Sequence, residues 1–152
     1  MSNYGTRIKL LEDAFFEKVI NVCKTRVHFK LLTLMKYDAK NNRARRIYTT
    51  DNINYPIGNY KTLPDNQWTS QVIVQQKSFI ANNISEIKKV FFDYQLISDM
   101  GLASVINVPI VSEGVLLGVV NLLHVKDSYN LVSCRKVERL SPWFTLLFKQ
   151  VN

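Results

Sequence analysis

The sequence has few of the residues from which chemistry is usually recognised. Two cysteines and two histidines are scattered over 152 residues, with no Cys-x-x-Cys, His-x-His or His-Glu-x-x-His pattern. It also contains no phosphate-binding glycine loop, no Gly-x-Ser-x-Gly elbow and no recognisable pair of catalytic carboxylates. We therefore expect no bound metal and no cofactor, and no short motif marks the protein as an enzyme.

The two cysteines, Cys23 and Cys134, are too far apart in the sequence to form a local pair. We interpret both as buried thiols in reducing surroundings. His124 would need a partner to act in catalysis, and no motif supplies one. We interpret it as a polar residue at the rim of a sheet.

No apolar run approaches the length that crosses a bilayer, and residues 1–7 are polar, unlike the apolar stretch of a signal peptide. We expect a cytoplasmic protein without a membrane partner. The net charge is +8, and its densest basic groups are Arg43, Arg45 and Arg46, and Arg135, Lys136 and Arg139. No nucleic-acid-binding motif accompanies them, so we expect a solvated basic surface and no nucleic-acid partner.

What the sequence does contain is enough apolar residues, 47% of the total, for a single domain spanning 1–152. Helical spacing of these residues predicts a helix over 6–26, with a face wide enough to contact both a sheet and a partner helix. The remaining pattern predicts strands over 28–37 and 43–50, an ordered loop over 51–62, a helix over 65–77 capped by Asp65, a strand over 78–81, one or two short helices over 84–100, strands over 103–111 and 115–125, and a helical segment from 131. Pro142 either kinks that last segment or, with Ser141, starts a new helix. This order predicts an α+β domain with a central antiparallel sheet.

The last two strands carry the strongest indication of a site. A three-residue turn over 112–114 would set Val111 opposite Val115. Counting outward from that pair places Asn107 and Asn121 on the same, otherwise apolar, face of the hairpin. A buried amide without a partner costs about 1–3 kcal/mol, so we expect a ligand or nearby loop backbone to satisfy both. A two-residue turn would instead place them on opposite faces.

Aromatic side chains from the segments expected to cover this face form a second candidate group: Trp68, Phe91, Phe92 and Tyr94. Aromatic residues at such spacing also build ordinary cores. Asp93, which lies between two of them, would cap a short helix or accept a hydrogen bond from a ligand amine.

Short segments along 8–148 are similar, in order and spacing, to those of GAF domains, in particular of stand-alone bacterial GAF proteins. These segments are Arg46-Ile47-Tyr48-Thr49-Thr50, Tyr55-Pro56-Ile57-Gly58, Trp68, Lys77-Ser78-Phe79-Ile80, Gly101-Leu102-Ala103-Ser104, Ile106-Asn107-Val108-Pro109-Ile110, Gly114 and Leu117-Gly118-Val119-Val120-Asn121-Leu122-Leu123-His124. Each is weak alone, and the resemblance rests on the whole set.

The resemblance implies a GAF-like antiparallel sheet of five or six strands, with the N- and C-terminal helices on one face. Loops and short helices would cover a ligand pocket on the other face, and the terminal helices would form a homodimer. Three departures narrow the ligand class. The pocket thiol that attaches a bilin, the signature of cyclic-nucleotide binders after the last strand, and the pocket cysteines of free methionine sulfoxide reductases are all missing.

We therefore expect a small-molecule-binding sensory domain, and not an enzyme, that signals through a partner or a dimer interface. The expected ligand-binding residues are Trp68, Phe92, Asp93, Tyr94, Ser104, Asn107, Asn121 and Tyr48. One alternative is a ligand-free dimerisation or interaction module whose pocket is filled by its own side chains. Another is a thiol-dependent enzyme like the methionine sulfoxide reductases.

Overall fold

A computed structural model describes the backbone of residues 2–151 and the side chains of residues 13–151. Its α-helices are α1 (Ser2–Arg26), α2 (Ile84–Lys88), α3 (Tyr94–Asp99), α4 (Leu131–Glu138) and α5 (Ser141–Gln150). Its strands are β1 (Leu31–Asp38), β2 (Arg43–Thr49), β3 (Lys61–Thr62), β4 (Phe79–Ala81), β5 (Ser104–Ser112) and β6 (Val115–His124). A short 3-10 helix, η1 (Ala39–Asn41), joins β1 to β2, and a π-helix, η2 (Thr69–Val74), precedes β4.

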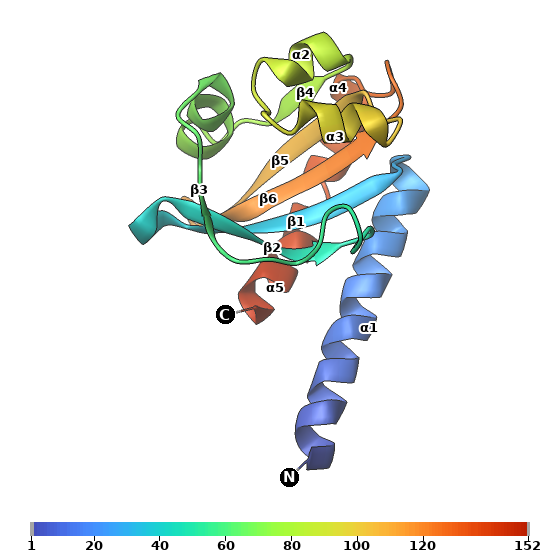
Figure 1. The fold of residues 1–152 in the computed structure, drawn as a ribbon. Coiled ribbons are helices and arrows are strands. Elements are labelled where there is room, and N and C mark those ends of the chain that lie inside the picture. Colours follow the sequence, from blue (N-terminus) through green and yellow to red (C-terminus); the bar gives the residue numbers. More distant parts are fainter. Residues whose placement is uncertain (1, 152) are drawn as a thin grey trace.

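The strands form one antiparallel sheet in the order β3-β2-β1-β6-β5-β4 (Figure 1). The longest strands, β1, β5 and β6, occupy its centre, where apolar residues on both faces require cover from two layers. The predicted α+β fold with five or six antiparallel strands is therefore confirmed.

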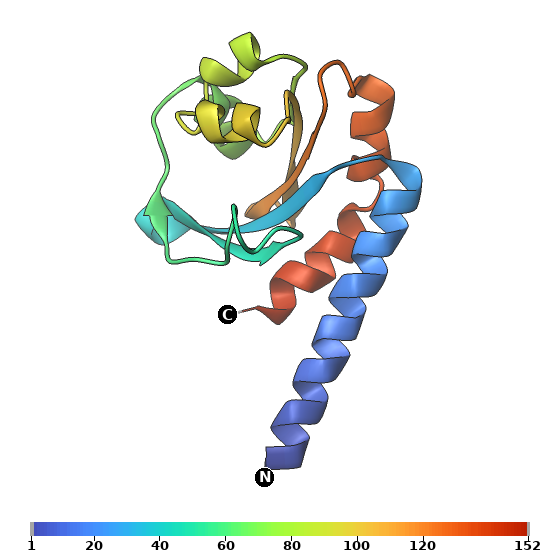
Figure 2. The same ribbon diagram turned by 45° about the vertical axis from the view of Figure 1, so that its right-hand side comes forward.

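Each face of the sheet has its own apolar layer, as the two ribbon views show (Figures 1 and 2). On the face that we call the helix side, α1, α4 and α5 pack on β1, β5 and β6 around the buried rings of Phe144 and Phe148. On the opposite face, which we call the cover side, η2, α2, α3 and the loop over 50–60 form two smaller clusters. Trp68 and Val119 lie in one of these clusters, and Tyr55 lies in the other.

The β5–β6 hairpin departs from the predicted turn and still places the two asparagines together. Its turn has two residues, Glu113 and Gly114, with φ of 52° and 79°. Positive φ at both central positions is typical of the type I′ turn, which suits the twist of paired strands. A bulge at Leu117 then shifts the register, and Asn107 lies directly opposite Asn121. The predicted three-residue turn is wrong. A two-residue turn alone would place Asn107 and Asn121 on opposite faces, but the extra residue in the bulge returns them to the same face.

Gly118 of β6 marks the closest approach of α5 to the sheet. A Cβ at this position would lie 2.4 Å from the Met35 carbonyl oxygen and 2.4 Å from Cε1 of Phe148. Real Cβ atoms do not approach other atoms so closely, so only glycine lets the Phe148 ring come this close to β6.

The starts of two helices, the one that leads into η2 and α5, differ from or decide between the sequence predictions. The Asn66 side chain, and not Asp65, accepts the Thr69 backbone N–H at 3.1 Å and begins the helical segment. Pro142 lies in the first turn of the separate helix α5, where its missing N–H has no helical partner to lose. Of the two alternatives at Pro142, the new helix is therefore confirmed and the kink is wrong.

Among the described residues, we find no helix with the length and apolar character needed to cross a membrane.

Candidate ligand-binding site

A chain of four polar side chains crosses the cover side of the sheet. The Trp68 indole donates to Oδ1 of Asn107 at 2.8 Å, and Nδ2 of Asn107 donates to Oδ1 of Asn121 at 2.6 Å. Nδ2 of Asn121 then donates to the Thr33 hydroxyl at 3.1 Å. Asn121 is paired in the sheet with both Asn107 and Thr33, so the chain runs straight across β5, β6 and β1. We call these residues, Trp68, Asn107, Asn121 and Thr33, the polar row.

The polar row is almost closed to solvent. Asn107 is 2% exposed, Trp68 and Thr33 are each 4% exposed, and Asn121 is half-buried. The two amides are satisfied by each other, by the indole and by a hydroxyl, and not by loop backbone as one sequence interpretation expected. Trp68 fills the space next to Asn107, so the sheet end of the site is occupied by the protein's own side chain.

The position of Trp68 depends on contacts between η2 and the segment between α2 and α3. Nδ2 of Asn66 donates to the Val90 carbonyl oxygen at 2.9 Å, and the Phe91 ring meets the indole edge-on at 5.7 Å between centroids. The i→i−5 hydrogen bond from Gln75 to Ser70 widens the helix at this point, and π-helical turns of this kind often occur at functional sites.

A second group of polar side chains lies where β2, the loop over 50–60 and α3 meet. The Tyr55 hydroxyl donates to Oδ2 of Asp93 at 2.7 Å, and the Arg46 guanidinium carbon lies 4.9 Å from the centre of the Tyr55 ring. Nη1 of Arg46 also donates to the Pro56 carbonyl oxygen at 2.9 Å. Burial, and then the hydrogen bond to Asp93, raise the pKa of Tyr55 far above its usual value, so the phenol stays protonated. We call Arg46, Tyr55 and Asp93 the charged group.

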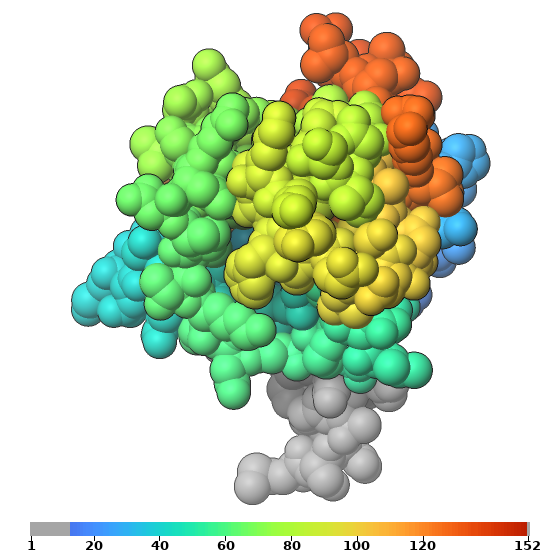
Figure 3. Space-filling view, turned by 45° about the horizontal axis from the view of Figure 1, so that its top comes forward, coloured from blue at the N-terminus to red at the C-terminus, as the bar shows by residue number. Residues whose placement is uncertain are grey.

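The two groups belong to one continuous surface. Met35, which pairs with Arg46 across β1 and β2, lies two residues from Thr33 on the same face of β1. In the space-filling view a furrow runs between the loop over 50–60 and α3, with atoms of the strands beneath visible at its floor (Figure 3). The charged group therefore lies on the same face of the sheet as the polar row, beside it on the β2 side.

The structure brings together only part of the predicted site. Trp68, Asn107 and Asn121 form the polar row, Asp93 belongs to the charged group, and Tyr94 packs in the cover-side cluster around Tyr55. Asp93 makes no side-chain capping bond to α3, so the capping interpretation is wrong.

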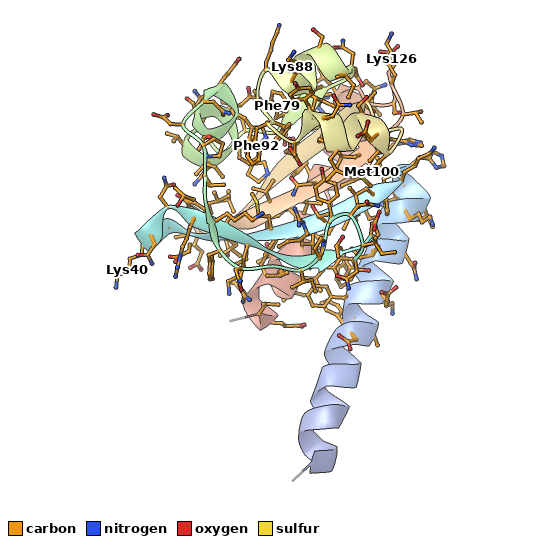
Figure 4. The ribbon with its side chains drawn as sticks, viewed as in Figure 1. Lys40, Phe79, Lys88, Phe92, Met100 and Lys126 are labelled. Carbon is orange, nitrogen blue, oxygen red and sulfur yellow. The ribbon has the colours of Figure 1, made fainter. Side chains whose placement is uncertain are left out.

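Phe92 does not join the site, because it is 86% exposed. Figure 4 labels Phe92 and also Phe79, which is partly buried. Ser104 lies on the helix side and donates to the Val125 carbonyl oxygen at 2.5 Å. Tyr48 also lies on the helix side, where it donates to Glu17 of α1 at 3.0 Å and stacks on Phe16.

A bulge in β2 explains the misplacement of Tyr48. Leu34 pairs with Tyr48 but Met35 pairs with Arg46, so Ile47 is left over and residues 46 and 48 face opposite sides. Sequence analysis placed Arg46 among the surface basic residues and gave no role to Tyr55 or Thr33. Strand alternation predicts which face a residue occupies. It would have placed Arg46 on the cover side only if the bulge at Ile47 had been known.

Solved structures share this architecture. The GAF domain of a two-component sensor histidine kinase from Bacillus halodurans matches with a TM-score of 0.73 at 16% identity, covering 91% of this chain and 93% of that one. The chain has a GAF fold.

The GAF fold also gives a TM-score of 0.69 at 12% identity with a domain of a phosphoenolpyruvate-protein phosphotransferase from Coxiella burnetii, covering 92% of this chain and 85% of that one. A type II free methionine-R-sulfoxide reductase from Thermoplasma acidophilum gives 0.68 at 10% identity, covering 92% and 95%. No protein-family profile and no curated protein matches the sequence. Because sensor and enzyme domains share the GAF fold, the function has to be argued from the site.

Proposed function

We propose that this GAF domain is a regulatory module that binds a small organic molecule on the cover side of its sheet. The observation that carries the proposal is the polar row. Indole, amide and hydroxyl groups lie in line on an otherwise apolar, covered face. Apolar walls with a few converging polar groups are typical of small-molecule sites.

The bound molecule would lie between β1–β2 and the loop over 50–60, with Tyr94 and the polar row as its inner wall. Asn121 is the half-buried member of the row and would make the first hydrogen bond. Trp68 and Asn107 hold it in place from behind, so its amide is already oriented before binding.

A thermal-shift screen against a metabolite collection tests the proposal. A ligand that binds only the folded state raises the melting temperature, by an amount set by its concentration relative to Kd. We expect at least one metabolite to do so, and the Asn121→Ala variant to lose most of that shift. A control variant, Asn21→Ala on the exposed face of α1, should keep the shift. A collection that leaves the melting temperature unmoved would contradict the proposal.

The output of the module would pass through α1 and α5 to a second copy of the chain. Trp143 and Leu146 of α5 are 51% and 48% exposed, and Trp143 lies 6.4 Å from the half-buried Phe15 ring of α1. A hollow of about 70 Å³ opens between the two helices beside these rings. Exposed aromatic residues around a hollow are typical of protein contact surfaces.

A ligand-free interaction module is the second candidate, and one observation favours it. Trp68 occupies the space beside the asparagines, and two hollows of the described residues lie elsewhere, on α1 and between α1 and α5. The same thermal-shift screen distinguishes the two candidates, because this module would associate without responding to any metabolite.

The thiols lend no support to a reductase. Burial raises the pKa of Cys23 to about 12 and that of Cys134 to about 11, so both remain protonated at neutral pH. Both also lie in the helix-side core, across the sheet from the polar row and the charged group.

A further inference from the structure

We propose that the ligand is an α-amino acid with an uncharged side chain, held by its carboxylate on Arg46 and by its ammonium group on Asp93. This inference rests on the proposed function and names the ligand class of the same site. It is argued from the charged group, and the polar row then limits the side chain.

Arg46 is a half-buried cation with unused hydrogen-bonding capacity. A guanidinium group has five N–H donors, and in the described residues Arg46 uses Nη1 for the Pro56 carbonyl and stacks on Tyr55. Burial lowers its pKa, which means that the charged form has lost part of its hydration. A planar guanidinium in this state is well matched to a carboxylate, which it can bind through two parallel hydrogen bonds.

Asp93 supplies the opposite charge, but it does not neutralise Arg46 directly. The two side chains form no ion pair within 4.0 Å, although the charge of Asp93 partly offsets the lowering of the Arg46 pKa by burial. Tyr55 keeps them apart, because its ring lies against the guanidinium and its hydroxyl binds the carboxylate. Oδ2 of Asp93 accepts this bond, and Oδ1 has no partner among the described residues.

One phenol thus holds a cation over its ring and an anion at its hydroxyl group. A ligand with only a carboxylate would satisfy Arg46 but would be repelled by Asp93, and a simple amine would meet the reverse problem. A zwitterion satisfies both groups at once and leaves no charge unpaired in a partly desolvated site. Inorganic phosphate is disfavoured for the same reason, because it carries no positive group for Asp93.

The interior of the site sets the side chain. Beyond Arg46 the cover side of the sheet presents Met35, Thr33 and Asn121, which are all neutral. A charged ligand side chain would be desolvated there without a counter-ion, at a cost of several kcal/mol. The residues therefore select apolar or amide side chains.

The experiment measures binding of the neutral L-amino acids to the full chain by calorimetry and thermal shift. Each amino acid is compared with its two truncated analogues, for example L-leucine with 4-methylpentanoate and with isopentylamine. We expect one or more neutral amino acids to bind and their analogues to bind about tenfold more weakly or not at all, because each analogue leaves one partly buried charge unpaired.

Variants assign the contacts. Arg46→Gln and Asp93→Asn should each weaken binding about tenfold or more. Arg46→Lys should retain part of the affinity, because lysine keeps the positive charge but cannot form the two parallel hydrogen bonds of a guanidinium group. Arg43→Gln is the matched control, since Arg43 lies on the same strand but is ion-paired to Asp38 at 2.8 Å. It should leave the affinity unchanged. Circular dichroism of each variant establishes that it is folded, and Arg46→Lys serves in place of Arg46→Gln should the latter unfold.

The outcomes separate the two proposals. Binding of a metabolite that lacks a carboxylate or an ammonium group, or of an amino acid whose affinity is unaffected by Arg46→Lys and Asp93→Asn, would overturn the inference and leave the proposed function intact. A response to no metabolite of any class would overturn both.

Discussion

Asn107 lies in the middle of the polar row and takes part in two of its three hydrogen bonds. Its oxygen accepts from the Trp68 indole and its amide donates to Asn121. Asn107 is 2% exposed and Trp68 is 4% exposed, so water has little access to replace the bond to the indole when Asn107 is removed. Neutral hydrogen bonds contribute little net stability each, but a buried group left without a partner costs much more. The row therefore fixes how η2 is seated on the sheet.

Replacement of Asn107 by alanine should destabilise the fold by about 1–3 kcal/mol. The Trp68 N–H and the Asn121 carbonyl oxygen would both lose their partners inside an apolar layer. Urea denaturation measures the change, with Asn21→Ala on the exposed face of α1 as a control expected to stay within about 0.5 kcal/mol of wild type. Equal stability of the two variants would show that the polar row is not a structural element.

His124 should make stability depend on pH. Its Nδ1 is buried without a hydrogen-bond partner, and its pKa is lowered by burial, then by Lys30 and His28. The unfolded chain binds the proton more readily, so the folded state loses stability as pH falls below the unfolded pKa of about 6.5. Above that pH the contribution is fully present.

Denaturation at a series of pH values between about 7 and 5 measures this slope, which His124→Gln should reduce. Asp38 and Asp51, whose carboxyl pKa values are lowered by hydrogen bonds from neighbouring residues, contribute only at lower pH and do not interfere in this window. An unchanged slope in the variant would assign the pH dependence to other groups.

At the scale of the elements, β6 combines two features that a sequence pattern does not separate. Leu117 forms the bulge that restores the alignment of Asn107 with Asn121, and Gly118 beside it admits the Phe148 ring. Bulges of this kind bend and twist a strand. The element that carries the candidate site is thus also the element on which α5 rests.

Gly118→Ala should destabilise the protein by about 1–3 kcal/mol, because the added methyl group meets the Met35 backbone and the Phe148 ring at once. Gly58→Ala is the matched control. Its added Cβ would have as its nearest neighbour the Pro56 carbonyl oxygen at 3.9 Å, and an alanine there reduces the freedom of the unfolded chain. Thermal unfolding should therefore show a marked loss for the first variant and little change or a small gain for the second.

The sequence was sufficient for the order and type of the elements, because apolar residues recur with a clear period in α1, β5 and β6. It was not sufficient for the register. The predicted turn had one residue too many, and the bulge at Leu117 was not visible, yet the two errors cancelled for Asn107 and Asn121. In β2 no such cancellation occurred. The bulge at Ile47 sent Tyr48 to the helix side and left Arg46 on the cover side.

The charged group could not be predicted for a different reason. Arg46, Tyr55 and Asp93 come from a strand, a loop and the start of a short helix, and the hydrogen bond between the last two joins residues 38 positions apart. The spacing of apolar residues along the sequence does not indicate that the loop over 50–60 contacts the start of α3. Asn107 and Asn121 of the polar row could be predicted, because they are amides among apolar neighbours. Thr33 could not, because threonine is common in strands.

For the molecule as a whole, the sheet separates two environments. The cover side holds the polar row and the charged group, and the helix side holds the largest apolar core and the exposed residues Trp143 and Leu146. Ligand binding and association between copies would thus occupy opposite faces, so that neither has to compete with the other for surface.

Association through α1 and α5 should respond to a charge placed at Trp143. We expect Trp143→Glu to weaken the dimer about tenfold or more, because a central aromatic residue would be replaced by a desolvated carboxylate. Sedimentation of the full chain over a range of concentrations measures the change. Ile53→Glu is the control, since Ile53 is also apolar and is more exposed, at 91%, but lies on the loop over 50–60 on the other face of the sheet. A wild-type chain that sediments as a monomer at high concentration would exclude this interface.

The first half of α1 extends beyond the sheet, while its second half is anchored in the helix-side core from Phe16 onward (Figure 2). Tyr48 ties the anchored half to β2, the strand that carries Arg46 on its other face. At 1.5 Å per residue this first half, up to Phe15, is about 20 Å long, so a tilt of about 10° at the anchored half would move its tip by about 3 Å. If ligand binding shifts β2, the helix would act as a lever, and its N-terminal end would move farther than β2 itself.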